Sequence, residues 1–323
     1  MRFLTRRLGF YLLTAWAAVT LNFLIPRLMP GDPVDLLVAR LKGNVDPAAI
    51  EAMKKAFGIS DAGLWTQYVD YLGNLFRGEL GRSITFFPTE VSTVIADSLP
   101  WTIGLVGVAT LISYVVGTSL GVLMAWKRGT WLDGVLPAAT FLHAVPYFWV
   151  ALVLVFVFGS TLQWFPGSRA YGLEVTPGFD AEFLASMAYH ATLPAVTIVL
   201  ASMADRILGM RNVMVTTLGE DYVVMAEAKG LTSRRVMWAY AARNAILPNI
   251  TSFALSLGFV VGGSVLTEIV FSYPGIGSML LKGVENEDFP LMQGIFLVIS
   301  LAVLVANLLA DLAYVILDPR TRQ

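Results

Sequence analysis

Long apolar runs alternate with short polar segments along most of the 323 residues of this chain. An α-helix rises about 1.5 Å per residue, so roughly 20 apolar residues are needed to cross the roughly 30 Å hydrocarbon core of a bilayer. Six charge-free stretches are long enough, and they predict an all-α polytopic membrane protein with six transmembrane helices. The stretches lie within residues 8–26, 98–126, 134–168, 183–204, 244–267 and 289–310.

The composition agrees with a membrane protein and excludes some kinds of chemistry. Charged residues make up 14% of the chain, against about 25% in an ordinary soluble domain. The absence of cysteine excludes disulfides, thiolate metal ligands and a cysteine nucleophile. Arg2, Arg6 and Arg7 precede the first apolar run, as in a secretory signal peptide, but no small-x-small cleavage site follows. A membrane helix is therefore favoured over a signal peptide.

Six spans place both termini on one side of the membrane, and the basic residues indicate which side. If the termini are cytoplasmic, the inner segments hold more than half of the 22 Lys and Arg residues but less than a third of the 23 Asp and Glu residues. The positive-inside rule therefore predicts that the N and C termini are both cytoplasmic.

Two outer segments are too polar to span the membrane and too long to be simple connections. Residues 28–97 contain the amphipathic pattern AAIEAMKKAFGI and the stretch WTQYVDYLGNLFRGELGRS, and residues 169–182 form a second outer loop. We expect small helices in the first of these segments, packed on the membrane domain. The predicted organisation is an N-terminal tail and first transmembrane helix at 1–27, an extracytoplasmic helical insertion at 28–97, and a core domain with five transmembrane helices at 98–323.

The inner segment between the fourth and fifth spans is basic and rich in small residues. The stretch MVTTLGEDYVVMAEAK predicts one helix that ends at a break at Gly230. A second helix is expected to be capped by Thr232 or Ser233 and to end at Pro248.

The first of these helices has a face that suits a partner protein. Ala226 and Gly230 are four residues apart, so they share a helix face with Tyr222 and leave a notch for another backbone. The alternative is an ordinary basic cytoplasmic loop in contact with lipid headgroups. The residues alone do not decide between the two.

The same segment resembles the coupling loop of ABC importer permeases. In DYVVMAEAKGL and the later RNAILP, Ala-x-Ala-Lys-Gly and Leu-Pro frame a helix that in this family docks into the ATPase subunit. Val224 and Met225 replace the family's glutamate and alanine, and the gap from Gly230 to Leu247 is longer than in the general signature. This longer form is similar to the dipeptide, oligopeptide and nickel importer subfamily.

Four further stretches extend the resemblance along nearly the whole chain. RFLTRRLGFYLL with RLMPGDPV, LGNLFRGELGRS, TEIVFSYPGIGSMLL and DFPLMQG resemble that subfamily in the same order. The enlarged outer segment is similar to that of the first of the two permeases in such an importer. The resemblance implies the type I ABC importer permease fold.

The resemblance also implies a coupling region at 212–247 and a set of residues that contact the ATPase. The mechanical role of the coupling region would be to transmit the nucleotide-driven closure of the ATPase subunits to the transmembrane spans. The ATPase-coupling residues are Tyr222, Ala226, Ala228, Lys229, Gly230, Leu231, Leu247 and Pro248.

The chain is expected to have no catalytic residues and no cofactor of its own. It contains no Gly-Lys dipeptide, so the Walker A loop that cradles ATP phosphates is absent. ATP and Mg would be bound by two partner ATPase subunits. The other implied partners are a second homologous permease, an extracytoplasmic substrate-binding protein and the lipid bilayer, with no nucleic acid, in a bacterial or archaeal cytoplasmic (inner) membrane.

The resemblance leaves the transported solute open. Peptides are the first expectation, oligosaccharides the second and nickel the third. A self-sufficient secondary transporter is the alternative from another class, but it would show acidic residues in mid-span or inverted repeats. Mid-span charge is nearly absent here.

Charged residues mark the inner end of the fourth span. Asp205, Arg206 and Arg211 follow its apolar run, and a charge at the bilayer centre costs about 2.5 to 3.5 kcal/mol. We therefore expect them at the interface or lining an inner vestibule, either as a structural ion pair or as a gate contact.

A proline- and glycine-rich stretch follows the fifth span on the outer side. Glu268 closes that span, and the residues after it allow a re-entrant or broken turn of the kind tolerated only against protein or a water-filled cavity. The candidate outer gate region consists of Glu268, Tyr273, Pro274, Gly275 and Gly277.

The remaining histidines and prolines carry less information. His143 and His190 have no clustered Cys, Asp or Glu beside them, so packing is favoured over metal binding and no metal site is predicted. Pro137, Pro146 and Pro194 are consistent with kinks in the third and fourth spans.

Overall fold

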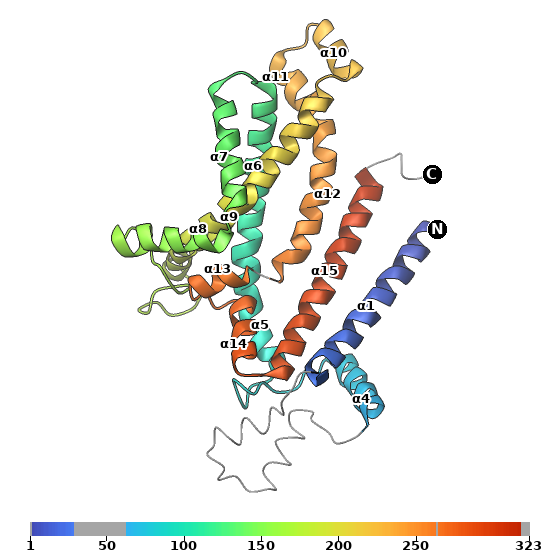
Figure 1. The fold of residues 1–323 in the computed structure, drawn as a ribbon, viewed down its shortest axis with the longest axis vertical. Helices are drawn as coiled ribbons and strands as arrows, with labels where there is room; N and C mark the ends of the chain where they lie inside the picture. The colour runs from blue at the N-terminus through green and yellow to red at the C-terminus, as the bar shows by residue number, and fades with distance from the viewer. Residues whose placement is uncertain (1, 29–62, 263, 318–323) are drawn as a thin grey trace. The chain divides into compact units, whose positions relative to one another are not determined.

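The computed structural model describes residues 2–28, 63–262 and 264–317, and these are almost entirely helical (Figure 1). The chain divides into two compact units, which are described separately. The first unit comprises Met1–Trp101 and Pro274–Leu304, and the second comprises Thr102–Tyr273 and Val305–Gln323. The amphipathic pattern expected around residues 48–59 lies outside the described residues.

Three described helices are long and apolar enough to cross a membrane, and they match three of the six predicted runs. They are Val91–Trp126, Ala181–Thr217 and Phe289–Leu309. A fourth span is obtained if Leu136–Leu142 and Tyr147–Thr161 are counted together, although the two helices are bent by 97°.

Two of the expected spans differ from a single continuous helix. The run at 134–168 breaks where Pro146 caps α8 (Tyr147–Leu154), after α7 (Val135–Ala144). Proline lacks the backbone N–H that would continue the helix. The run at 244–267 is divided between α12 (Arg243–Val260) and α13 (Val265–Val270). By contrast, α9 (Ala181–Thr217) continues through Pro194.

In the first unit, α1 (Arg2–Leu28) packs against α4 (Leu64–Phe76), which is a small outer-segment helix of the kind expected. The Phe23 ring is 2% exposed and meets the Tyr68 ring edge-on at 5.1 Å. Arg27 donates from Nε to Gln67 Oε1 at 2.9 Å. Burial lowers the pKa of Arg27, although its nearness to Tyr71 opposes that shift.

Asp288 ties the end of the outer segment to the start of α15 (Phe289–Leu317). Its Oδ2 accepts hydrogen bonds from Ser83 Oγ and from the Thr85 backbone N–H, and its Oδ1 accepts one from the Leu291 N–H at 3.1 Å. Asp288 and Ser83 are both fully buried. The carboxylate therefore caps α15 and fixes the outer segment on it. The adjacent apolar core is formed by Val91, Val94, Ile95, Ile276, Leu291 and Ile295.

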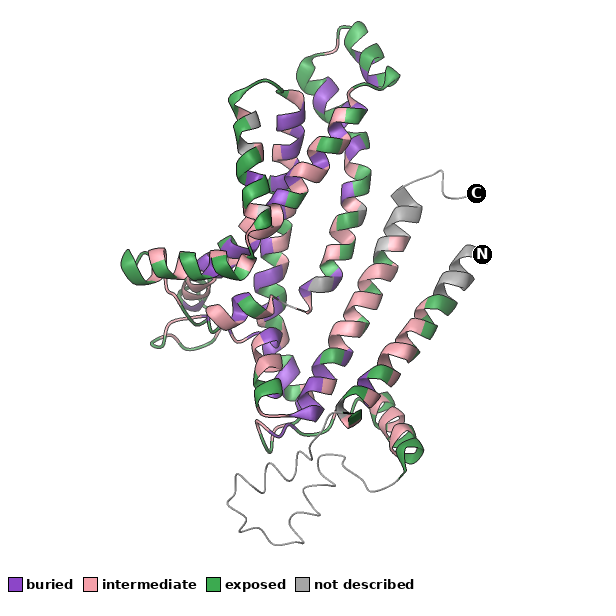
Figure 2. Ribbon diagram, in the orientation of Figure 1, coloured by how far each residue is buried: buried purple, intermediate pink, exposed green. Residues whose placement is uncertain are grey.

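The second unit is built around close packing of α6 (Val108–Trp126) and α9. A Cβ atom at Gly117 would lie 2.7 Å from Arg206 Cβ, and one at Gly121 would lie 2.7 Å from the Ile207 carbonyl oxygen. Small residues allow membrane helices to approach this closely. Buried positions recur along α6 and α9, whereas much of α7 and α8 is exposed (Figure 2).

Candidate functional site

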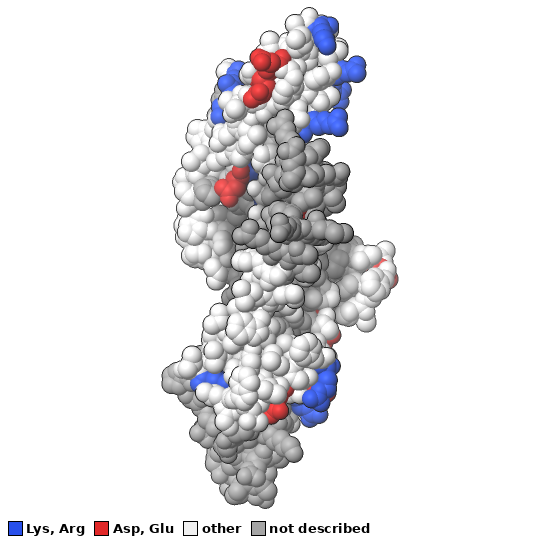
Figure 3. Space-filling view, turned by 90° about the vertical axis from the view of Figure 1, so that its right-hand side faces the viewer, with Lys and Arg blue, Asp and Glu red and all other residues white. Residues whose placement is uncertain are grey.

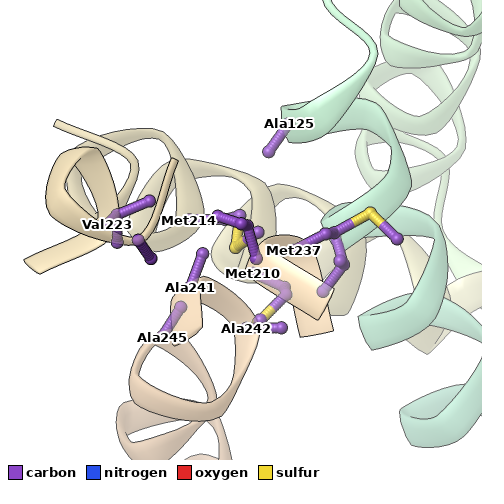
Figure 4. Packing of buried hydrophobic residues seen from close by; sticks show 11 residues of the cluster. Ala125, Met210, Met214, Val223, Met237, Ala241, Ala242 and Ala245 are labelled. Atoms are coloured by element: carbon purple, nitrogen blue, oxygen red, sulfur yellow. The ribbon is translucent and has the colours of Figure 1, made fainter. Parts of the chain in front are cut away.

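A short helix, α10 (Asp221–Ala228), lies within the predicted coupling region 212–247, in the second unit. Its Val223 and Ala226 are 1% and 2% exposed. Their side chains lie among Met210 and Met214 of α9 and the small residues that precede and begin α12 (Figure 4). The buried residues of this anchor cluster are Val122, Ala125, Met210, Met214, Val223, Ala226, Val236, Met237, Ala241, Ala242 and Ala245. α10 is therefore packed directly on α9 and on the segment that leads into α12.

The side of α10 that faces away from the anchor cluster carries large apolar side chains. Val224 and Met225 are 54% and 58% exposed, and Tyr222, which lies one turn before Ala226 at the edge of the buried face, is 39% exposed. Adjacent exposed apolar residues on a short helix are typical of a helix that docks into a groove on a partner. Val224 and Met225 are not among the coupling residues predicted from the sequence.

The notch expected from Ala226 and Gly230 is not present, because the Ala226 methyl group faces the anchor cluster. Gly230 has φ +75°, and a Cβ atom there would meet nothing within 4 Å. Its N–H donates to the Glu227 carbonyl at 2.8 Å. Gly230 therefore supplies the left-handed turn that ends α10.

The helix boundaries in this region also differ from the prediction. The stretch 214–229 is not one helix, because α9 ends at Thr217 and α10 begins at Asp221. α11 (Ser233–Arg235) begins after Thr232 as expected, but Thr232 makes no side-chain capping bond. Pro248 lies inside α12 instead of ending the helix.

A π-helical segment, η4 (Val236–Ala242), directly precedes α12. The other coupling residues lie around α10: Ala228 is its last residue, Lys229 caps it, Leu231 packs on the anchor cluster and Leu247 is partly exposed on α12.

The predicted inner vestibule residues lie on the C-terminal half of α9, and no hydrogen bond satisfies Arg211 Nε within the described residues. Asp205 is exposed and Arg206 is half-buried. Tyr114 Oη and Thr118 Oγ1 of α6 are likewise buried and unsatisfied there. A buried polar atom without a partner costs about 1 to 3 kcal/mol. These three atoms favour water or a polar solute as an additional partner.

The predicted outer gate residue Glu268 lies inside α13 and is fully buried. Its Oε1 accepts a hydrogen bond from Thr102 Oγ1 at 2.9 Å, and its backbone carbonyl accepts one from the Tyr273 N–H at 2.7 Å. Glu268 therefore does not close the fifth span, because α12 has already ended at Val260. Burial, and then the nearby Glu268, raise the pKa of Tyr273 to about 12, so its phenol stays neutral at physiological pH.

The expected broken turn is present after Glu268. Ser272 has φ +49°, and the Phe271 carbonyl accepts a hydrogen bond from the Arg169 N–H at 2.8 Å. Pro274 follows this turn, Gly275 is the N-cap of α14 (Ile276–Glu285), and Gly277 is inside α14.

His190 is held by its own helix. Its Nδ1 lies 2.8 Å from the Ser186 carbonyl oxygen, whereas the side chain of His143 is outside the described set. Among the described residues, no group of three or more His, Cys, Asp or Glu side chains is placed to hold a metal.

Comparison with known proteins gives the family. Residues 117–323 match the family described as "Binding-protein-dependent transport system inner membrane component". The chain is 34% identical to the di/tripeptide transport system permease protein DppB of Pseudomonas aeruginosa, over 100% of this chain and 99% of that protein.

Two further relatives match along most of their length. The oligopeptide transport system permease protein AppB of Bacillus subtilis is 33% identical, over 93% of this chain and 92% of that protein. The probable D,D-dipeptide transport system permease protein DdpB of Escherichia coli is 33% identical, over 97% and 94%.

The chain belongs to this family of inner membrane components. It is the permease component of an ABC importer and not the ATPase.

Proposed function

We propose that this permease forms, together with a second homologous permease, the path by which peptides cross the inner membrane. An extracytoplasmic binding protein delivers the peptide, and two ATPase subunits that bind ATP and Mg drive the transport. The proposed topology is the type I importer fold with six transmembrane helices and both termini in the cytoplasm. The long described apolar helices and the charge distribution support this topology.

The coupling proposal rests on the arrangement of α10. One face of the helix packs in the anchor cluster through Val223 and Ala226, while Val224 and Met225 are exposed on the other side and Tyr222 is exposed at the edge of the buried face. An ATPase that holds the exposed face would move α9 and α12 when it closes on nucleotide. Ala228, Lys229, Gly230 and Leu231 complete the docking helix and its end, and Leu247 and Pro248 belong to the helix that receives the movement.

The same movement would reach the two gate segments. We place the inner vestibule at Asp205, Arg206 and Arg211, where the unsatisfied Arg211 Nε supports contact with water or solute. We place the outer gate at Glu268, Tyr273, Pro274, Gly275 and Gly277, where the broken turn and the buried Glu268 support a segment with two discrete arrangements.

Peptide is the favoured solute because the three relatives described above are named as peptide permeases and match nearly the whole chain. An oligosaccharide importer is the alternative, followed by a nickel importer. Selectivity would reside largely in the binding protein.

Purification of the assembled complex from its own host tests this proposal. Mass spectrometry should identify a second permease, two ATPases and a binding protein that carries peptide, and proteoliposomes should take up peptide only with ATP. If the binding protein carries only sugar, the transported solute is an oligosaccharide and not a peptide. Transport by this chain alone without ATP would overturn the assignment to an ATP-driven importer.

A further inference from the structure

An open hollow of about 490 Å³ lies beside the coupling helix, at the start of the helical segment that leads into α12. It is lined by Thr232, Arg234, Arg235 and Trp238. These four residues lie within the coupling region 212–247, but none of them is among the residues proposed to contact the ATPase. The inference that follows rests on the proposed cytoplasmic placement of this segment.

The backbone fixes the direction in which these side chains point. Arg234 and Arg235 lie one helical turn before Trp238, so the three side chains share one side of the segment. The intervening Val236 and Met237 are buried in the anchor cluster on the other side. The hollow therefore has a rigid floor, and its basic and aromatic walls face outward.

The two arginines have unused binding capacity. Both are exposed, and neither guanidinium forms a hydrogen bond or ion pair with another part of the chain that the structure describes. Lys and Arg side chains gather at the end of the second unit where α10 and α11 lie (Figure 3). Guanidinium groups bind phosphate oxygens in a bidentate fashion, so an anionic ligand fits this hollow.

We propose that this hollow binds the phosphate of an anionic phospholipid headgroup from the cytoplasmic leaflet. Trp238 is 43% exposed at the hollow, and tryptophan is enriched at the membrane interface, where its ring is apolar and its N–H is polar. The same helical segment continues into the apolar α12, whose Leu255 is exposed. Basic pockets on the cytoplasmic side of membrane helices hold such headgroups.

The position of the hollow favours a lipid phosphate as its ligand over an acidic surface of the ATPase. The apolar face of α10 already offers the ATPase an exposed docking surface. The hollow instead begins immediately before the membrane helix. Binding here would hold the start of α12 at the membrane surface while α10 moves.

Native mass spectrometry of the complete importer, released from nanodiscs of phosphatidylglycerol and phosphatidylcholine, tests the proposal. The double variant Arg234→Gln/Arg235→Gln should retain phosphatidylglycerol about 30-fold less than the unmodified complex, since each basic residue near the surface contributes about a kcal/mol. Arg243→Gln is the matched control, because Arg243 is exposed at the start of α12 but does not line the hollow. It should retain the lipid normally.

Three outcomes would overturn the proposal. Equal retention in both variants means that the hollow binds no lipid. Loss of the ATPase subunits with lipid unchanged means that the arginines bind the ATPase. Displacement of phosphatidylglycerol by millimolar inorganic phosphate, without any effect of bilayer composition, means that the ligand is free phosphate.

Failure of the underlying orientation is measured separately. The chain has no cysteine, so Ser233→Cys provides a unique thiol beside the hollow. Labelling of this thiol only from outside intact cells would overturn the cytoplasmic placement, and with it the proposed topology. Labelling only after the membrane is opened would agree with the proposed topology. The lipid measurement then tests the headgroup site independently.

Discussion

Asn22 of α1 and Gln293 of α15 exchange two hydrogen bonds. Asn22 Nδ2 donates to the Gln293 carbonyl oxygen at 2.8 Å, and Gln293 Nε2 donates to the Asn22 carbonyl oxygen at 3.1 Å. Asn22 is 7% exposed. Each side chain therefore bonds to the other residue's backbone, which joins the two helices of the first unit at one level.

Replacing either side chain should loosen this joint. Gln293→Leu should lower the free energy of unfolding by about 0.5 to 1.5 kcal/mol, because it removes one interhelical hydrogen bond. Asn22→Leu should lower it by more, because Asn22 Nδ2 also donates to Tyr71 Oη of α4 at 3.3 Å. Thermal unfolding of the purified chain in detergent measures the loss. Asn286→Leu is the control, since the Asn286 side chain donates to the Lys282 carbonyl at the end of its own helix. An equal loss of stability in the control would contradict the role of Asn22 and Gln293 in joining α1 to α15.

The contact between α6 and α9 predicts that Gly121 tolerates no larger side chain. Gly121→Leu should destabilise the protein by about 1 to 3 kcal/mol or more, because the new side chain would overlap Ile207 and Met210. Gly104→Leu is the matched control, since a Cβ atom at Gly104 meets nothing within 4 Å. If both variants unfold at the same temperature, the close packing of α6 on α9 is wrong.

Removal of the Thr102 hydroxyl, which donates to the buried Glu268, should lower the stability of the protein more than removal of an exposed hydroxyl does. Thr102→Val should cost about 1 to 3 kcal/mol of stability, because it removes a hydrogen-bond donor from a buried carboxyl group. Thr140→Val deletes an exposed hydroxyl that bonds only its own helix and should cost little. A double-mutant cycle with Glu268→Gln measures the coupling, and a coupling energy near zero would argue against the pair.

Gly230 should matter for coupling through its backbone conformation. Gly230→Ala places a side chain at φ +75°, which costs about 1 to 2 kcal/mol, and should loosen the end of α10. We expect reduced peptide uptake per ATP hydrolysed in proteoliposomes. Gly129 has the same φ and open surroundings, so Gly129→Ala carries a similar backbone cost away from α10. If the two variants take up the same amount of peptide per ATP hydrolysed, Gly230 has no specific role in coupling.

The apolar runs predicted the helices well, because length and hydropathy are local properties. The breaks were harder to predict. Pro146 does interrupt its run, whereas Pro194 and Pro248 lie inside continuous helices. The difference depends on how neighbouring backbone adjusts to each proline, which the residue type does not reveal.

The site was predictable in position but not in orientation. The motif placed α10, yet the spacing of Ala226 and Gly230 did not show which face is buried, since Ala226 is small enough for either side. The pairing of Thr102 with Glu268, 166 residues apart, and of Ser83 with Asp288, 205 residues apart, depends on tertiary structure. A possible signal for Asp288 was its place directly before an apolar run, where aspartate caps helices.

The central claim is that the exposed face of α10 carries ATPase movement into the permease. The most direct test is ATP-driven peptide uptake by the reconstituted importer with Val224→Asp/Met225→Asp, which places charge on that face without touching the anchor cluster. Trp131→Asp, at an exposed apolar residue away from α10, is the control. We predict that the double variant remains folded but loses most of its uptake and releases the ATPases, while the control transports normally. Unchanged uptake by the double variant would contradict the account.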